Sequence, residues 1–208
     1  MEEKKLHIIQ NVGQMYLKFG IRAVTMDDVA SEFGISKKTL YQYFSDKEDL
    51  VSHVVDFFLE SSTLDFKNKP AENAIIGMFI VRSHVANILK IYNNNIEFEL
   101  KKSYPTLYKK VHDEKRQRIF DNTIENLKQG ISQGFYRNEL DPQFIAKLQV
   151  GRMLYTLNPD YGIFEDYEVN TIALFDNMMD YHMHAICTEK GLEYYQKQLN
   201  RIQNEDKN

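Results

Sequence analysis

A short basic and aromatic stretch offers the clearest chemistry in this sequence. Between Gly34 and Phe44 the chain carries side chains that bind phosphate or read base edges, namely Lys37, Lys38, Thr39, Tyr41, Gln42 and Tyr43. Lysines attract phosphates, hydroxyl groups and helix-start amides hold phosphate oxygens, and Lys or Gln can hydrogen-bond to bases in the major groove. We expect Lys47, a few residues further on, to add a phosphate contact. This pattern predicts a surface that docks on double-stranded DNA.

The same residues have a plainer interpretation. A lysine pair at the start of a helix is usually solvated surface, and a pair of tyrosines usually packs against its neighbours. The whole chain has a net charge of −4, and residues 1–50 contain seven Lys and Arg against eight Asp and Glu. Because bulk charge does not favour binding to a polyanion, the DNA interpretation depends on the local placement of these side chains.

Start and stop signals predict the helices that precede this stretch. An apolar stripe along the first helix ends at Gly20, a residue suited to the left-handed position after a helix. Thr25 and Asp28 have the spacing of a capping box, which predicts a second helix over about 26–33. Gly34 then ends that helix.

The stretch itself is predicted to form a third short helix over about 37–43, capped by Ser36. Leu40 and Phe44 lie four residues apart, so both can face the interior while the polar side chains face outward. Ser45 and Glu48 repeat the helix-start spacing, which predicts a fourth helix from about Asp46 through the sequence VVDFFLE. Two short helices joined by a glycine turn are typical of a helix-turn-helix.

The rest of the chain also shows helical periodicity. We expect helices over about 71–93, 96–102, 105–130, 142–157, 166–188 and 190–203. Gly134 stops one of them, Asp141-Pro142 starts the next, and NPDYG at 158–162 forms a loop. The sequence therefore predicts an all-α protein with a three-helix head at residues 1–47 and a larger helical body at 48–208.

The segment TMDDVASEFGISKKTLYQYFSDKEDLV closely resembles the helix-turn-helix signature of the TetR family of bacterial transcriptional regulators. The resemblance spans about residues 6–52. The matching positions are Thr25, Val29, Ala30, Gly34, Ser36, Lys37, Thr39, Leu40, Tyr41, Phe44, Lys47, Glu48 and Leu50. The remaining three quarters of the chain match only in helical layout.

This resemblance implies roles for the residues of the head. It makes Thr25, Tyr43, Tyr41 and Lys47 phosphate contacts, and it makes Ser36 a helix cap or a phosphate contact. The candidates for base edges are Lys37, Lys38, Thr39 and Gln42. At the position of Lys38 the family very often has glycine or another small residue, so a long cation there can read guanine or hold a phosphate.

The resemblance further implies a homodimer that binds a palindromic operator through its DNA-binding head and a small-molecule effector through its body. It favours repression, with release by the effector, and an effector pocket between the helices at about 96–128 and 142–186. Candidate lining residues are Phe79, Phe98, Tyr108, Phe120, Tyr155 and Phe175. Aromatic stripes of this kind are more often core than pocket. The last large helices are apolar over more than one face, as expected of helices covered by a partner subunit.

Two further patterns have weak functional interpretations. Asp176, Asp180 and His184 share one helix face and could bind a metal, although a polar strip is the simpler interpretation, and we predict no metal site. The basic run at 101–118 resembles a second nucleic-acid patch. Acidic residues interrupt it with helical spacing, which favours a solvated face.

Other function classes lack support. The sequence has no nucleophile elbow, HExxH zinc motif, P-loop or dinucleotide fingerprint, so we predict neither an enzyme nor a cofactor. The single cysteine, Cys187, and the absence of a signal peptide or a long apolar run predict a cytoplasmic protein with no membrane partner. The alternative function is a helix-turn-helix protein controlled by a protein partner or acting as a DNA-dependent adaptor.

Overall fold

The computed structural model of the chain describes residues 2–60, 66, 69–91, 94–156, 158, 161–169 and 171–205. Within these ranges the regular elements are helices, which confirms the all-α prediction. The chain divides into two compact units. We call Met1–Thr63 with Ile91–Lys115 the N-terminal unit, and Leu64–Lys90 with Arg116–Asn208 the C-terminal unit. No helix in the described ranges is long and apolar enough to cross a membrane.

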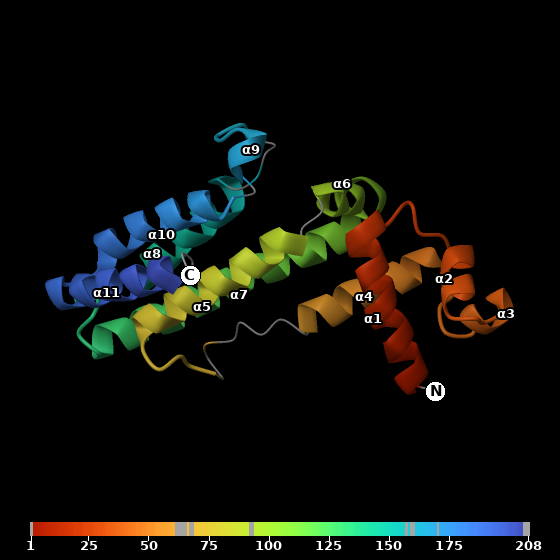
Figure 1. Cartoon of the computed structure of the whole chain (residues 1–208), viewed down its shortest axis with the longest axis horizontal. Helices are drawn as coiled ribbons and strands as arrows, with labels where there is room; N and C mark the ends of the chain where they lie inside the picture. The colour runs from red at the N-terminus through yellow and green to blue at the C-terminus, as the bar shows by residue number, and fades with distance from the viewer. Residues whose placement is uncertain are drawn as a thin grey trace. The chain divides into compact units, whose positions relative to one another are not determined.

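The N-terminal unit is built on the crossing of two helices. It contains α1 (Glu2–Phe19), α2 (Met26–Glu32), α3 (Lys37–Leu40), α4 (Lys47–Glu60), α6 (Asn94–Ser103) and the first part of α7 (Pro105–Ser132). In Figure 1 the red α1 crosses the orange α4, and α2 and α3 lie near the start of α4. Their apolar faces share one core, which includes Val12, Val29, Leu40 and Leu50. This core also takes in Leu100 of α6, so α4 and α6 pack with the first three helices.

Local signals in the head produce the expected helix boundaries. Gly20 has φ 85°, which confirms the left-handed stop after α1. Thr25 caps α2 in a complete capping box, in which its hydroxyl accepts from the Asp28 amide and the Asp28 carboxylate accepts from the Thr25 amide. Ser36 caps α3 as predicted, and its hydroxyl accepts from the amide of Thr39 at 3.1 Å.

Two details of the predicted boundaries were wrong. The helix expected over 37–43 ends at Leu40, because the amides of Gln42 and Tyr43 bond to carbonyls three residues back and tighten the chain into a turn. The cap of α4 is Asp46 in place of Ser45. The Asp46 carboxylate accepts from the amide of Asp49, and the Ser45 amide donates to the Asp49 carboxylate, both at 2.8 Å.

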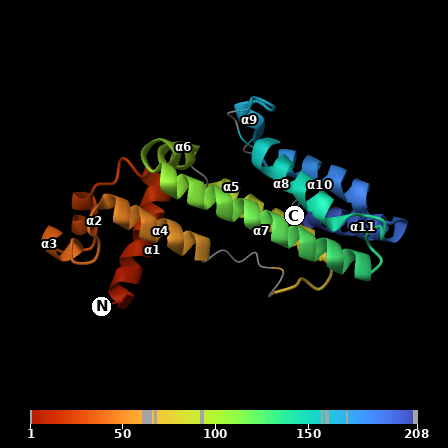
Figure 2. The ribbon, with the colours of Figure 1, turned by 180° about the vertical axis from the view of Figure 1, so that it is seen from behind.

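The C-terminal unit is a set of packed long helices. It contains α5 (Ala74–Ile91) up to residue 90, the rest of α7, α8 (Pro142–Gly151), the π-helical η1 (Arg152–Thr156), α9 (Asp166–Val169), α10 (Ile172–Ile186) and α11 (Glu189–Glu205). Figures 1 and 2 show α5 alongside α7, and α8 alongside α10. Residues of α5, α7, α10 and α11 meet in a second core, around Ile75, Leu127, Met183 and Tyr195.

The body departs from the predicted helices in three places. The helix expected from 71 starts at Ala74, because the Asn73 side chain accepts from the Ile76 amide at 2.9 Å. The helix expected over 142–157 changes to a π-helical turn at Arg152. The helix expected over 166–188 is divided, because Thr171 caps α10 and its hydroxyl accepts from the Leu174 amide. The Asp141 cap and Pro142 start of α8 are confirmed.

A buried polar chain ties the C-terminal unit together around Tyr136. The hydroxyl of Tyr136 donates to the side-chain oxygen of Asn126 at 3.0 Å, and the Asn126 amide nitrogen donates to the carbonyl of Ala74 at 2.7 Å. Tyr136 is 1% exposed, and its ring lies against the backbone of Gly130 in α7. A Cβ at position 130 would lie 2.0 Å from the ring, so this packing requires glycine.

We predict that Gly130→Ala destabilises the chain by about 3 kcal/mol, because the added methyl group displaces the Tyr136 ring. Gly151→Ala is the matched control, since a Cβ at that position would have no neighbour within 4 Å. It should be neutral or gain up to ~1 kcal/mol from helix propensity. Urea unfolding followed by circular dichroism measures both. Equal stabilities for the two variants would contradict the proposed packing.

A buried histidine makes the same unit sensitive to acid. His182 on α10 is 7% exposed. Burial, and secondarily the charge of Arg152, lower the pKa of His182 from 6.5 to about 3. The unfolded chain therefore takes up a proton near pH 6.5 that the folded chain rejects. The contribution of His182 to stability is complete above pH 6.5 and is lost as the pH falls from there toward 3.

We predict that His182→Gln reduces the loss of stability between pH 7.5 and pH 5 by about 2 kcal/mol relative to the wild-type chain. The exposed His184 supplies the control variant His184→Gln. Urea midpoints at the two pH values give the comparison. The assignment fails if His182→Gln and the wild-type chain lose the same stability over this range.

Candidate nucleic-acid interface

The short helix α3 and the turn after it are held in place by two inward side chains. Leu40 is 0% exposed and Phe44 is 1% exposed, and both belong to the core of the N-terminal unit. At Gly34 the chain turns with φ 59°, and the Ile35 amide donates to the carbonyl of Ala30 at 3.0 Å. Ile35 is half-buried against the same core. The turn and the two anchors therefore fix which face of α3 points outward.

The outward face carries the cations and amides identified in the sequence. Lys37, Lys38, Tyr41 and Gln42 are exposed, and 48% of the Tyr41 surface is accessible. Lys37 forms an ion pair of 2.6 Å with Asp27 of α2, and both side chains are more than half exposed. Such an exposed pair contributes little to stability, so Lys37 can exchange Asp27 for another anion at low cost.

The two helix-cap residues, Thr25 and Ser36, are exposed, and their hydroxyl groups form hydrogen bonds within the caps. Thr25 donates its hydroxyl to the Asp28 carboxylate at 2.6 Å, and this hydrogen bond is the main cause of the lowered pKa of Asp28. Ser36 shares a hydrogen bond of 2.8 Å with the half-buried Thr39. Thr25 and Ser36 are therefore the N-caps of α2 and α3, the two helices of the motif, and both caps lie at the protein surface.

Tyr43 and Lys47 are half-buried at the edge of the surface. Tyr43 packs against the N-terminal core. Lys47 donates to the carbonyl of Arg22 at 3.4 Å, which is a long contact. Burial lowers the pKa of Lys47, while the charges of Glu99 and Asp28 oppose that shift. The side chain of Lys47 is thus partly buried in the N-terminal unit.

The nine sequence-predicted residues lie at positions 25–47 of the N-terminal unit, and two residues that the sequence did not single out interact with this part of the chain. Arg22 is exposed and interacts electrostatically with Lys47. Arg22 lies three residues before the Thr25 cap, so its position in the sequence could have indicated a cation close to the start of α2. Glu99 lies on α6 and bonds to the turn before α2. No local pattern indicates a partner 78 residues away.

The comparisons with known proteins place this motif in a family. Residues 14–54 match the family model described as bacterial regulatory proteins, tetR family. The match runs from α1 through α2 and α3 into α4, and so includes the whole surface described above. Curated relatives share the same kind of name. The chain is 26% identical over 158 residues to the HTH-type transcriptional repressor KstR2 of Mycobacterium tuberculosis (strain H37Rv). This match covers 71% of this chain and 76% of KstR2.

Over residues 14–54 the chain is thus similar to the bacterial regulatory proteins of the tetR family. It is also 37% identical over 68 residues to the uncharacterized HTH-type transcriptional regulator YerO of Bacillus subtilis (strain 168), a match that covers 33% of this chain and 24% of YerO. Solved structures extend the likeness beyond the motif, although they are too distant in sequence to show more than the fold.

Two of these structures serve as examples. A TetR-family regulator from Agrobacterium tumefaciens is similar in structure, with a TM-score of 0.63 and 15% sequence identity. The superposition covers 90% of this chain and 99% of the Agrobacterium chain. The ketosteroid transcriptional regulator KstR2 of Mycobacterium tuberculosis superposes with a TM-score of 0.52 and 17% sequence identity. This superposition covers 89% of this chain and 96% of the KstR2 chain. The helical layout of both units is thus that of TetR-family regulators.

The six aromatic residues predicted to line an effector pocket are dispersed. Phe98 and Tyr108 belong to the N-terminal unit, where Phe98 is 59% exposed and Tyr108 packs against the core. In the C-terminal unit, Phe79 and Phe175 lie in one core, Phe120 is half-buried, and Tyr155 is 50% exposed beside Tyr161. Phe79 and Phe175 therefore share a cluster, and the other four do not join it.

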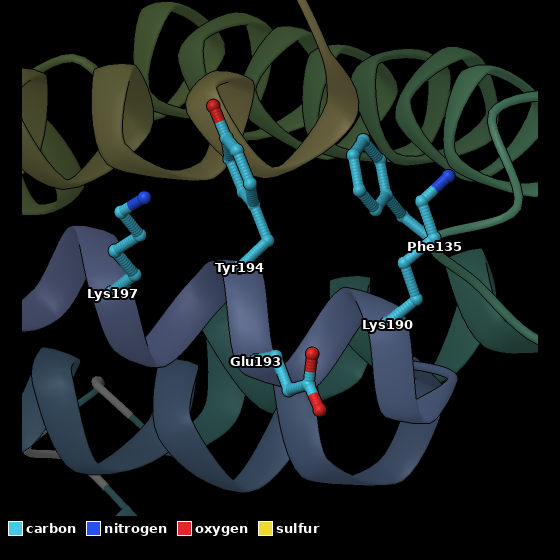
Figure 3. Close-up of a pocket in the computed structure, with 5 residues that line it drawn as sticks. All are labelled: Phe135, Lys190, Glu193, Tyr194 and Lys197. Atoms are coloured by element: carbon cyan, nitrogen blue, oxygen red, sulfur yellow. The ribbon is translucent and has the colours of Figure 1, made fainter.

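The open groove in Figure 3 is lined by none of these residues. It has a volume of about 330 Å³ and is bordered by Phe135, Lys190, Glu193, Tyr194 and Lys197. The rings of Phe135 and Tyr194 lie 5.2 Å apart, and Lys190 sits 4.7 Å above Phe135, whereas Glu193 points away (Figure 3). Since its aromatic faces and one of its lysines already contact each other, we assign no ligand to this groove.

The residues considered for a metal have other partners. Asp176 accepts two hydrogen bonds from Arg82, of 2.6 and 2.8 Å, and Asp180 accepts from Tyr195 at 3.3 Å. His184 lies 3.4 Å from the Asp180 carboxylate. No cluster of three or more His, Cys, Asp or Glu suited to a metal occurs among the residues that the structure describes. The three residues thus form a polar strip on α10.

The basic run at 101–118 is interleaved with acidic partners. Lys109 pairs with Asp113 on the same helix, and Lys110 pairs with Asp56 of α4 at 2.6 Å. Lys115 lies 3.7 Å from Glu97. This alternation of charge fits a solvated face better than a second nucleic-acid patch.

We predict that Leu40→Ala destabilises the chain by about 2–5 kcal/mol, whereas Lys38→Ala changes stability by less than about 0.5 kcal/mol. The two residues are neighbours on α3, and only Leu40 is buried. Chemical denaturation monitored by circular dichroism distinguishes them. A large loss from Lys38→Ala would mean that the outer face of α3 is packed and unavailable to a ligand.

Proposed function

We propose that this chain is a TetR-family repressor that binds a palindromic operator as a homodimer and is released by a small-molecule effector. The observation that carries the proposal is the division of α3 and the turn after it, residues 37–44, into two faces. Leu40 and Phe44 are buried, while Lys37, Lys38, Tyr41 and Gln42 are exposed. A four-residue helix is too short to be stable by itself, so the buried side chains must hold it in place. We infer that they do so to present the exposed side chains to a ligand.

The proposed docking places α3 in the major groove. Lys37, Lys38, Thr39 and Gln42 then approach base edges, while Tyr41 and Tyr43 reach phosphates on either side. Thr25, Ser36 and Lys47 contribute hydroxyl groups, helix-start amides and a cation to the backbone. On binding, Lys37 leaves Asp27 for the DNA, an exchange of one exposed ion pair for another.

The second copy of the chain is proposed to bind the C-terminal unit. Large apolar side chains on α8 and η1 remain exposed, with Phe144 at 56%, Leu148 at 54% and Tyr155 at 50%. On the neighbouring α10, Tyr181 is 72% exposed. Such a stripe suits burial against its own two-fold copy in a helical bundle. A dimer would then present two α3 helices to major grooves about one helical turn apart.

The effector is proposed to be largely apolar with one or two polar groups. The C-terminal core holds Phe79 and Phe175 and is rich in methionine, which adapts to irregular ligands. Near it, Arg152 donates to Gln149, and its buried Nε has no partner among the described residues. An oxygen of an effector would satisfy this donor. The effector releases DNA only if it favours a different arrangement of the heads.

Selection of bound duplexes from a random pool tests this function. We expect an enriched palindrome with half-sites about one helical turn apart, and an affinity that falls steeply with salt because phosphate-bound lysines release counterions. The protein-partner alternative predicts no effect of small molecules on this binding. Absence of any enriched sequence would reject operator binding.

We predict that Lys37→Ala combined with Tyr41→Ala weakens binding to the selected duplex at least ~100-fold, with helicity and dimer mass unchanged, because both residues are exposed. The matched control is Lys197→Ala with Tyr167→Ala, which removes the same exposed side chains from the C-terminal unit. Titration by fluorescence anisotropy gives the affinities. Wild-type affinity in the head variant would show that another surface binds the DNA.

A further inference from the structure

A single carboxylate of α6 holds the turn that joins α1 to α2. Glu99 Oε2 accepts from the amide of Ile21 at 2.6 Å and from the amide of Arg22 at 3.1 Å. The two partners are 78 and 77 residues away in sequence, yet all three lie in the N-terminal unit. Hydrogen bonds from amides to an ionised oxygen are short and strong, so this contact fixes the turn against α6.

The surrounding residues are adapted to this contact. Ile21 is 2% exposed, and a buried amide needs an acceptor. A Cβ at position 20 would lie 3.2 Å from Glu99 Oε1, so Gly20 permits the carboxylate to approach in addition to supplying the positive φ. Removal of the carboxylate would leave two adjacent amides without their acceptor.

The turn leads directly to the proposed DNA surface. The carbonyl of Arg22 accepts from Lys47, and Thr25 caps α2 three residues later. Glu99 is the main charge that opposes the effect of burial on Lys47 and so favours its ammonium form. The carboxylate thus acts on both the backbone before Thr25 and the charge of Lys47.

Apolar packing alone does not explain a carboxylate at this position. Leu100 and Leu107 are 7% and 8% exposed in the same core, so α6 and α7 already bury apolar side chains there. Hydrophobic contacts are non-directional and permit sliding, whereas hydrogen bonds to two successive amides define one register. Glu99 therefore specifies an orientation that the leucines leave open.

We propose that Glu99 is a positioning residue for operator binding, which sets the place of Thr25 and Lys47 relative to α3 by holding the amides of Ile21 and Arg22. The inference rests on the proposed function. It assigns a role in DNA affinity to a residue of α6, outside the helix-turn-helix and beyond residues 14–54 that match the family model.

Three variants test the proposal on the duplex selected by the wild-type chain. Glu99→Ala removes the acceptor, Glu99→Gln keeps a neutral acceptor, and Glu97→Ala removes an acid from the same helix as a control. We expect Glu99→Ala to weaken binding ~10-fold or more and to lower the salt slope by about 1 per head, because Lys47 loses its placement. Glu99→Gln should fall between, and Glu97→Ala should bind like the wild-type chain.

Amide hydrogen exchange measured by NMR on the free proteins separates positioning from unfolding. In Glu99→Ala, exchange should quicken at Ile21 and Arg22 while the amides of α10 keep their protection. Faster exchange at these two amides with wild-type affinity and salt slope would overturn the proposal and leave Glu99 as a structural cap. If Glu99→Ala does not fold, Glu99→Gln decides through the same two measurements, and faster exchange at Ile21 and Arg22 with wild-type affinity in that variant overturns the proposal.

The outcomes also separate this inference from the function on which it rests. A wild-type chain that enriches no duplex rejects operator binding and the role of Glu99 together. A wild-type chain that binds its palindrome, and Glu99 variants that bind it equally well, reject only the role of Glu99.

Discussion

The burial of Leu40 and Phe44 is the constraint on which the head of this chain depends. A helix of four residues cannot offset its own cost of nucleation, so α3 depends on the entry of two side chains into the N-terminal core, Leu40 at its end and Phe44 after the turn that follows. Once they are buried, the helix can rotate little about its axis. Its remaining side chains must then face outward, and the sequence places cations, a tyrosine and an amide there. The burial of Leu40 and Phe44 thus determines which polar side chains are exposed to a ligand.

The anchor is itself supported by polar contacts from two other helices. The ring of Phe44 meets the imidazole of His53 on α4 edge to face at 5.6 Å, and Lys5 of α1 lies 5.3 Å above the same ring. Lys5 and His53 are 2.7 Å apart, with the imidazole Nδ1 2.8 Å from the carbonyl of Asp49. The chain just after α3 is thereby in contact with α1 and α4. Together with the Glu99 contact to the turn before α2, these contacts connect the segment after α3 and the turn before α2 to the rest of the N-terminal unit.

Sequence reasoning succeeded where the cause of a structure lies within a few residues of its effect. The stop at Gly20, the Thr25–Asp28 box, the Ser36 cap and the Asp141-Pro142 start depend on local hydrogen bonds, and the sequence shows them. The end of α3 at Leu40 was missed because two competing turn geometries fit the same residues. The bond from Glu99 to Ile21 was invisible because its partners meet only after folding. The effector candidates are dispersed for a similar reason, since aromatic stripes do not reveal which core each ring will join.

The central claim is that the outward face of α3, with the caps beside it, is the surface that meets DNA. Backbone amide NMR spectra of the chain titrated with its selected duplex test this claim most directly. The account predicts that the largest shifts fall at residues 25, 36–43 and 47, with small changes along the basic run at 101–118. Large shifts in that run, with the amides of α3 unmoved, would contradict it.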